Sequence, residues 1–287
     1  ARASARLHDS DKVQEYLRNA EECEPAAAMA VEISLAEMRL QDGEYHQAIA
    51  ALNHSLANPG SHPAVLRLLC QAYEGLQDWD KLRELLPQLQ KHKLLNREDF
   101  EQLERQVCLH SLGSGDVGLE ALRARWQQVP KPLRDDAAFV EVYVRRLIEC
   151  ADHTAAEKAI LRVLKQEWRI PLVRVYGYVE SDSSRQLAKA ESWLAAHPKE
   201  PQLLLCLGRL SARDGLWGKA RDYFETAYRL EKTTEICAEL GRLLDALGEP
   251  IVAAAYFREG LMLQEKDLPV LPRPDRYLHD PALVASV

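Results

Sequence analysis

Apolar and small residues recur at helical spacing along the chain, most clearly within residues 201–232. The first half of this stretch places Leu207 and Gly208 on one helical face, and Gly215 stands where that helix must end. The second half continues with small and bulky residues on one face, at Ala220, Phe224 and Ala227. The pattern therefore predicts two antiparallel helices that approach closely at their small residues.

The same marks return 33 residues later along the chain. Gly241 matches Gly208, Gly248 matches Gly215, and the second helix repeats its pattern at Ala253, Phe257 and Gly260. Earlier copies follow the same register: Leu35, Ala36, Gly43, Tyr45, Ala48 and Leu52; then Leu69, Cys70, Trp79, Leu82 and Leu86; and, more weakly, Tyr143, Val144, His153, Ala156 and Ile160. A period of this length indicates helical hairpins that stack on one another. We therefore predict an all-α fold, an α-solenoid of stacked antiparallel helical hairpins.

This pattern resembles the tetratricopeptide repeat, a helix-turn-helix unit of about 34 residues. The resemblance implies one solenoid over residues 1–287 and a role in binding other molecules. Its predicted parts are a partial N-terminal hairpin (1–24), N-terminal repeats (25–165), an irregular shortened repeat (166–200), C-terminal repeats (201–266) and an extended tail (267–287).

Two places depart from the regular pattern. Pro87 lies inside a predicted helix, where it removes a backbone hydrogen bond, so we expect a kink or an early end there. Pro171 and Gly177 fall in a stretch rich in β-branched and aromatic residues, which predicts a short, distorted or partly extended first helix in the 166–200 repeat. This joint is either a flexible or functional point or only a shortened repeat.

Composition narrows the class of protein. The formal net charge of −7 argues against general affinity for nucleic acid or anionic lipid, although it leaves room for a local basic groove. The six cysteines form no CxxC pair, and we interpret them as reduced core residues in a reducing compartment, which implies the cytoplasm. No apolar run approaches the roughly 18 residues of a membrane helix, so we expect any anchor to lie outside this chain.

Catalytic and cofactor motifs are weak. Gly113, Gly115 and Gly118 spell GxGxxG, but a helix is predicted where a dinucleotide site needs a strand, so we interpret them as a turn between paired helices. His92 and His279 are each single candidates for a haem ligand, which carries little information. We therefore predict no catalytic residue, no metal site and no certain cofactor, and hence a protein that is not an enzyme.

Arginines recur at one position of the predicted first helices, directly after the small packing residue or one turn away. If these helices line the concave face, the arginines form a basic stripe suited to a peptide terminus, an acidic segment or porphyrin propionates. The alternative is that they are surface arginines paired with Glu141, Glu149 or Asp245. The candidate partner-binding residues are Arg67, Arg145, Arg209, Arg213 and Arg242.

Longer stretches are similar to the soluble part of the HemY family, an inner-membrane family of proteobacteria associated with a late step of protohaem synthesis. The segments that carry the similarity are residues 31–89, 147–160 and 203–230, which include HPAVLRLL and DW-x-x-L-x-x-LLP. Members of the family carry two N-terminal membrane helices followed by a basic cytoplasmic collar, and we expect this sequence to begin after that anchor. The resemblance implies a domain on the cytoplasmic side of the bacterial inner membrane.

The resemblance also implies a function. We expect a scaffold that holds late haem-pathway enzymes together, with ferrochelatase or porphyrinogen oxidases as partners. The first alternative is a carrier that binds haem or porphyrin. The second is an assembly factor for other envelope enzymes.

Overall fold

The computed structural model describes residues 25–56, 62–115 and 118–264. Every regular element in these ranges is a helix, which confirms the all-α prediction. The predicted N-terminal partial hairpin (1–24) and the extended tail (267–287) lie outside the described residues. The chain divides into two compact units, Ala1–Ala151 (unit 1) and Asp152–Val287 (unit 2), where a single solenoid is predicted.

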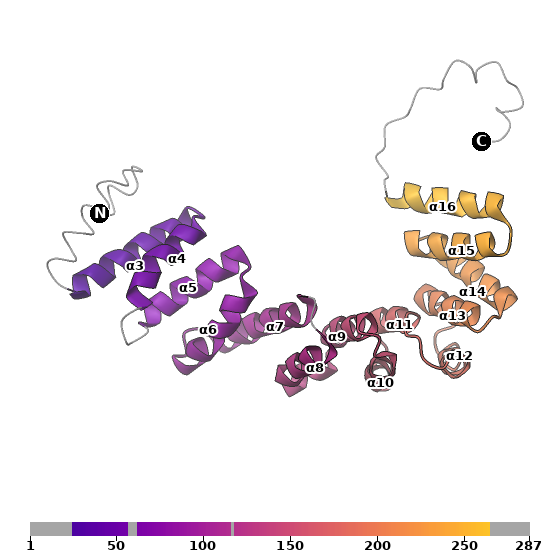
Figure 1. Cartoon of the computed structure of the whole chain (residues 1–287), viewed down its shortest axis with the longest axis horizontal. Coiled ribbons are helices and arrows are strands. Elements are labelled where there is room, and N and C mark those ends of the chain that lie inside the picture. Colours follow the sequence, from indigo (N-terminus) through magenta and orange to yellow (C-terminus); the bar gives the residue numbers. More distant parts are fainter. Residues whose placement is uncertain (1–24, 57–61, 116–117, 265–287) are drawn as a thin grey trace, which may run out of the picture. The chain divides into compact units, whose positions relative to one another are not determined.

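Unit 1 is a stack of antiparallel helices joined by short turns (Figure 1). Consecutive helices contact one another, and the first helices of neighbouring hairpins also touch, α3 against α5 and α7 against α9. The elements are α3 (Pro25–Gln41), α4 (Tyr45–Leu56), α5 (Pro63–Leu76), α6 (Trp79–Lys91), α7 (Arg97–Gly113), α8 (Leu119–Gln128), the 3₁₀ turn η1 (Lys131–Asp135) and α9 (Ala137–Glu149).

Polar side chains cap the starts of two helices in unit 1. Asn96 caps α7, since its Oδ1 accepts a hydrogen bond from the backbone N–H of Asp99 at 2.8 Å. Asp136 caps α9 by accepting from the N–H of Ala138 at 2.9 Å. Gly113 ends α7 and Gly118 caps α8, so the GxGxxG glycines surround a helix-to-helix connection, as predicted.

Of the two outcomes expected at Pro87, the early end is wrong, because α6 continues to Lys91, and the kink stays a prediction. Leu85 and Leu89 are buried on either side of the proline and hold this turn against the core. Pro87 itself is exposed. The carbonyl that it leaves without an intrahelical partner therefore belongs to the solvent side of the helix, where water can satisfy it.

Unit 2 repeats the same architecture (Figure 1). Its first helices again touch, α11 against α13 and α13 against α15. The prediction of a short first helix in the 166–200 repeat is confirmed, because α11 has only 7 residues. The elements are α10 (His153–Leu164), α11 (Ile170–Tyr176), α12 (Ser183–Glu191), α13 (Pro201–Arg213), α14 (Trp217–Leu230), α15 (Thr234–Ala246) and α16 (Pro250–Gln264).

Small residues permit the close approach of paired helices, as the repeat predicts. A Cβ atom at Gly208 would lie 2.3 Å from the ring of Phe224, and one at Gly241 would lie 2.5 Å from the ring of Phe257. The turns also need glycine, since Gly215 and Gly248 have φ of 76° and 82°. Helix packing therefore requires glycine at 208 and 241, and backbone conformation favours it at 215 and 248.

Three of the six cysteines predicted to lie in the core do so, whereas Cys108 and Cys150 are only partly buried and Cys23 lies outside the described residues. Cys70, Cys206 and Cys237 are buried and carry free thiols. Burial raises the pKa of the Cys70 and Cys206 thiols to about 12, so both are protonated near neutral pH. They behave as small hydrophobic side chains.

Candidate partner-binding groove

The first helices of unit 2 carry a groove that contains three of the five predicted arginines. Its volume is about 410 Å³, and it lies over α13 and α15 beside the loop that follows α11. We call it the arginine groove. The lining residues that matter for its chemistry are Tyr178, Arg209, Arg213, Trp217, Glu239 and Arg242.

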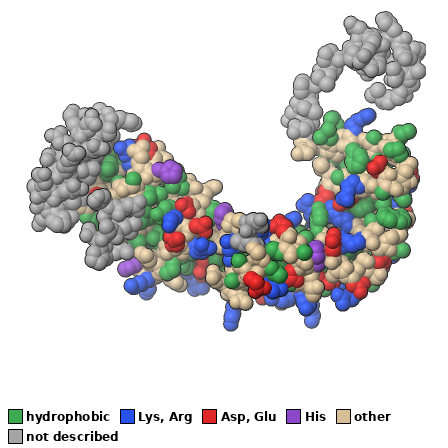
Figure 2. Space-filling model, in the orientation of Figure 1, with side chains coloured by type: hydrophobic (Ala, Val, Ile, Leu, Met, Phe, Trp, Pro, Cys, Tyr) green, Lys and Arg blue, Asp and Glu red, His purple; other side chains and the backbone are tan. Residues whose placement is uncertain are grey.

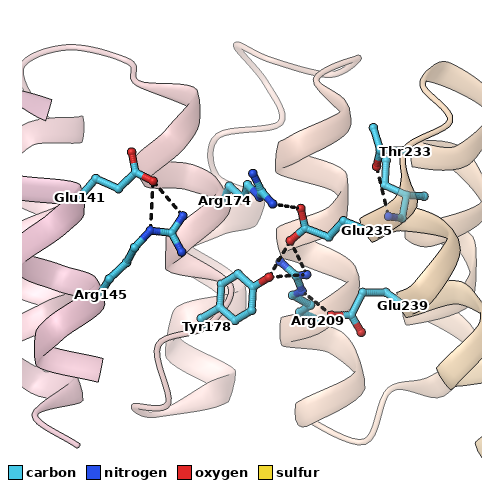
Figure 3. A network of polar contacts seen from close by, with 9 residues as sticks. Glu141, Arg145, Arg174, Tyr178, Arg209, Thr233, Glu235 and Glu239 are labelled. Carbon is cyan, nitrogen blue, oxygen red and sulfur yellow. Dashed lines mark hydrogen bonds and ion pairs between the residues drawn. The ribbon is translucent and has the colours of Figure 1, made fainter. Parts of the chain in front are cut away.

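Arg209 lies at the centre of a polar network in this groove (Figure 3). Its Nε donates to Glu239 Oε1 at 2.8 Å, and its Nη2 donates to Glu235 Oε1 at 2.7 Å. The residue is 7% exposed. A guanidinium buried to this extent needs such partners, since an unpaired charge in the interior is strongly unfavourable.

Tyr178 closes the network from the loop after α11 (Figure 3). Its hydroxyl accepts from Arg209 Nη2 at 3.0 Å and donates to Glu235 Oε1 at 2.6 Å. The Arg209 guanidinium carbon also lies 4.1 Å from the centre of the Tyr178 ring, which adds a cation–π contact. Arg174 of α11 pairs with the second oxygen of Glu235 at 2.5 Å. The network therefore joins α11, α13 and α15.

Electrostatics keep the network charged. Burial alone favours the protonated form of Glu235, but hydrogen bonds from Tyr178 and Arg209 outweigh it and lower the pKa of this carboxyl. Burial likewise opposes the charged form of Arg209, and the hydrogen bonds and charges of Glu235 and Glu239 outweigh it and raise the pKa of the guanidinium. Both groups are ionised at neutral pH.

The local sequence explains this geometry. Thr233 caps α15 by accepting from the N–H of Ile236 at 3.2 Å, which places Glu235 in the first turn of the helix, near its positive end. Glu235 and Glu239 are four residues apart and so share one face of α15. Gly177 makes room for the arginine, because a Cβ atom there would lie 3.2 Å from Arg209 Cδ.

The other two arginines of the groove are held differently. Arg213 donates to the carbonyls of Val179 and Gly177, at 2.5 Å and 2.9 Å, and burial lowers the pKa of its guanidinium. Arg242 donates to Glu239 Oε2 at 3.0 Å, while its side chain is 73% exposed. Arg213 thus fixes the loop after α11, and Arg242 extends toward solvent.

The remaining predicted arginines belong to unit 1. Arg67 donates to the carbonyl of Leu94 at 3.2 Å and lines a separate cavity of about 640 Å³. Arg145 pairs with Glu141 at 2.8 Å, as the surface-pair alternative proposes. Arg242 also makes an ion pair, but with Glu239 and not with Asp245. The prediction that all five form one basic stripe stays a prediction.

Glu74 gives the unit 1 cavity an acidic character. It lines that cavity together with Asp99 and a group of amide side chains. Burial, and then the nearby charge of Asp99, raise the pKa of the Glu74 carboxyl. This cavity therefore differs in charge from the arginine groove.

Sequence reasoning missed four residues that shape the groove: Tyr178, Trp217, Glu235 and Glu239. The i, i+4 spacing of the two glutamates marks a shared helical face, but it does not show that an arginine of the preceding hairpin reaches them. Tyr178 falls in the irregular stretch, where no repeat register assigns it a position.

The chain is similar in sequence to HemY proteins along most of its length. No family model matches the chain. Over 272 residues it is 29% identical to Protein HemY of Escherichia coli K12, covering 94% of this chain and 68% of the relative. The chain is a HemY homologue. The HemY protein of Shigella flexneri matches with the same values, 29% identity over 94% of this chain and 68% of that relative.

Solved helical-repeat structures are similar at lower identity. The Cut9–Hcn1 hetero-tetramer of APC/C is 14% identical, with a TM-score of 0.41, over 82% of this chain and 53% of that one. The TPR domain of P58(IPK) is 15% identical, with a TM-score of 0.30, over 86% of this chain and 68% of that one. Among the described residues, no helix is both long and apolar enough to span a bilayer, and no group of three metal-ligating side chains comes together.

Proposed function

We propose that this chain is a non-enzymatic scaffold that supports late protohaem synthesis by holding pathway enzymes together. The proposed partners are ferrochelatase or porphyrinogen oxidases. The proposed place is the cytoplasmic side of the bacterial inner membrane, with this chain as the soluble part of an anchored protein. The link to haem synthesis rests on the relationship to HemY proteins.

The observation that carries the scaffold role is the arginine groove. It lies on the row of first helices, α13 and α15, and it combines an exposed cation, Arg242, with the exposed indole of Trp217. Aromatic residues and arginine are enriched where proteins bind one another. Porphyrins are poorly soluble, so enzymes held close together transfer them at a higher effective concentration.

Capture from bacterial membrane extract tests the proposal. The purified chain is expected to retain ferrochelatase or a porphyrinogen oxidase, identified by mass. Arg242→Glu is expected to reduce this capture, because it reverses the exposed charge of the groove. Arg229→Glu is the matched control, since Arg229 is an exposed arginine of α14 outside the groove. Failure of the unmodified chain to enrich any haem-pathway enzyme contradicts the proposal.

A carrier of haem or porphyrin is the second candidate. Arg213 and Arg242 beside Trp217 offer cations for propionates and an apolar surface for a ring. Among the described residues, however, no histidine lines the arginine groove. A Soret shift on titration with micromolar haem, lost in Arg242→Glu, supports this candidate, and an unchanged spectrum excludes it. The remaining alternative, assembly of other envelope enzymes, predicts different co-captured proteins.

A further inference from the structure

The arginine groove has more positive than negative charge on its lining. Three arginines line it, Arg209, Arg213 and Arg242, against two carboxylates, Glu180 and Glu239. On the face that Figure 2 shows, acidic and basic side chains are mixed. A ligand with a carboxylate brings this lining closer to neutrality.

One nitrogen of the central arginine has no partner. Arg209 Nη1 is buried and donates to no hydrogen-bond acceptor among the described residues, although Nε and Nη2 both donate to partners. Its side chain is only 6% exposed. Buried donors of charged groups are almost always satisfied in native proteins, so this nitrogen indicates an acceptor that is absent from the isolated chain.

Arg242 supplies a second donor at the same site. Glu239 accepts from Arg209 with Oε1 and from Arg242 with Oε2, which joins the two guanidinium groups through one carboxylate. Arg242 uses Nη1 for this bond, and its side chain is 73% exposed. Its outer edge can therefore donate to an incoming carboxylate without breaking the pair with Glu239.

Part of the lining is apolar. Trp217 is 48% exposed where α14 begins, and Leu243 and Ala246 of α15 line the groove with it. The volume of about 410 Å³ lies near the lower end of the range of roughly 300–1,000 Å³ for ligand pockets. A short segment fits this space, and its chemistry must be both acidic and apolar.

We propose that the arginine groove binds an extended peptide segment of a partner protein in which an aspartate or glutamate lies next to a bulky apolar side chain. The carboxylate pairs with Arg242 and approaches Arg209, and the apolar side chain packs against Trp217. This inference deepens the proposed scaffold function and rests on it. The acidic and apolar segment is the feature of the partner that the groove recognises, and the capture experiment identifies the partner itself.

A peptide array that presents every tripeptide between Gly-Ser spacers tests the inference on the full chain. Tripeptides that join Asp or Glu to Phe, Leu or Trp are expected to give the strongest binding. Arg242→Gln is expected to weaken them about tenfold, the effect of one charge-assisted hydrogen bond. Trp217→Ala is expected to remove the preference for the apolar residue while keeping that for the carboxylate. Arg229→Gln, which removes an exposed arginine outside the groove, is expected to change nothing.

Two results overturn the inference. The first is a preference for basic or uncharged tripeptides, or no binding above background. The second is equal binding by the unmodified chain and by Arg242→Gln, with both shown to be folded by thermal unfolding. If either occurs while haem-pathway enzymes are still captured, the scaffold function survives and another surface carries it. If the array result is as expected but no such enzyme is captured, the groove is a peptide site and the haem-pathway role fails.

Discussion

Hairpins α13–α14 and α15–α16 carry the same sequence marks and bury them to different extents. Phe224 packs on Gly208 and is 1% exposed, whereas Phe257 packs on Gly241 and is 43% exposed. The side chain of Arg209 is 6% exposed, whereas that of its counterpart Arg242 is 73% exposed. The first hairpin is covered by α15, and no described helix covers the second.

This comparison shows what a neighbouring hairpin adds to a repeat. α15 brings Glu235 and Glu239 to Arg209, so the arginine becomes part of the interior. Among the residues that the structure describes, no carboxylate of a following helix reaches Arg242, and its partner Glu239 lies on its own helix. Apolar side chains of α16 are also exposed, with Ile251 at 87% and Leu261 at 57%. Figure 2 shows green side chains at this end of unit 2.

The largest expected effect comes from removing the buried arginine. Arg209→Met removes the buried cation that Glu235 and Glu239 share and leaves them only the more exposed Arg174 and Arg242, so we expect a loss of about 3–5 kcal/mol in the free energy of unfolding of unit 2. Arg242→Met, at the matched position, is expected to cost less than about 0.5 kcal/mol. Urea unfolding combined with hydrogen exchange of α13 to α15 measures both. Equal losses contradict the comparison.

Acid is expected to weaken the same network by a smaller amount, because it neutralises one carboxyl and leaves the arginine in place. The folded pKa of Glu235 lies below its unfolded value, which is about 4.3. Its contribution is therefore complete above that value and is lost as pH falls through the folded pKa. Between about pH 6 and about pH 3, the unmodified chain should lose stability more steeply than Glu235→Gln. If the free energies of unfolding of the two proteins fall in parallel over this range, the Glu235 carboxylate does not stabilise the network.

Adding one methyl group tests the difference between the two glycine–phenylalanine contacts. Gly208→Ala is expected to cost about 1–3 kcal/mol, because the ring of Phe224 is buried and has no space to move. Gly241→Ala is expected to cost less than about 1 kcal/mol, since the half-exposed ring of Phe257 can turn toward solvent. Thermal unfolding ranks the two variants. Phe224→Leu should partly rescue Gly208→Ala by making room.

Alanine substitutions in the turns of the two hairpins are expected to cost the same stability, because the strain they cause is local and does not depend on the neighbouring hairpin. Gly215 and Gly248 both have positive φ, and nothing lies within 4 Å of a Cβ atom built on either. Gly215→Ala and Gly248→Ala should therefore each cost about 1 kcal/mol, the strain of the left-handed conformation. Unequal losses of stability would mean that contacts with neighbouring hairpins also affect the turns.

Residues whose role is set within one hairpin were predictable from the sequence. The close contact at Gly208, the turn at Gly215 and the cap at Asn96 follow from helical spacing and backbone preference, which act over a few residues. The same reasoning found the short α11, because Pro171 and the β-branched residues around it disfavour a long helix. The early end expected at Pro87 is wrong, because burial of the flanking leucines holds the helix together.

The sequence by itself determined the repeat: which residues form helices, where glycine must stand, and which first-helix positions carry arginine. Only the tertiary structure decided that Arg209 is an interior residue and Arg242 a surface one, and that Tyr178 joins the network. The physical reason is that repeat register places a residue relative to its own hairpin. Burial and ion pairing depend on side chains that the next hairpin supplies, such as Glu235, 26 residues further along the chain.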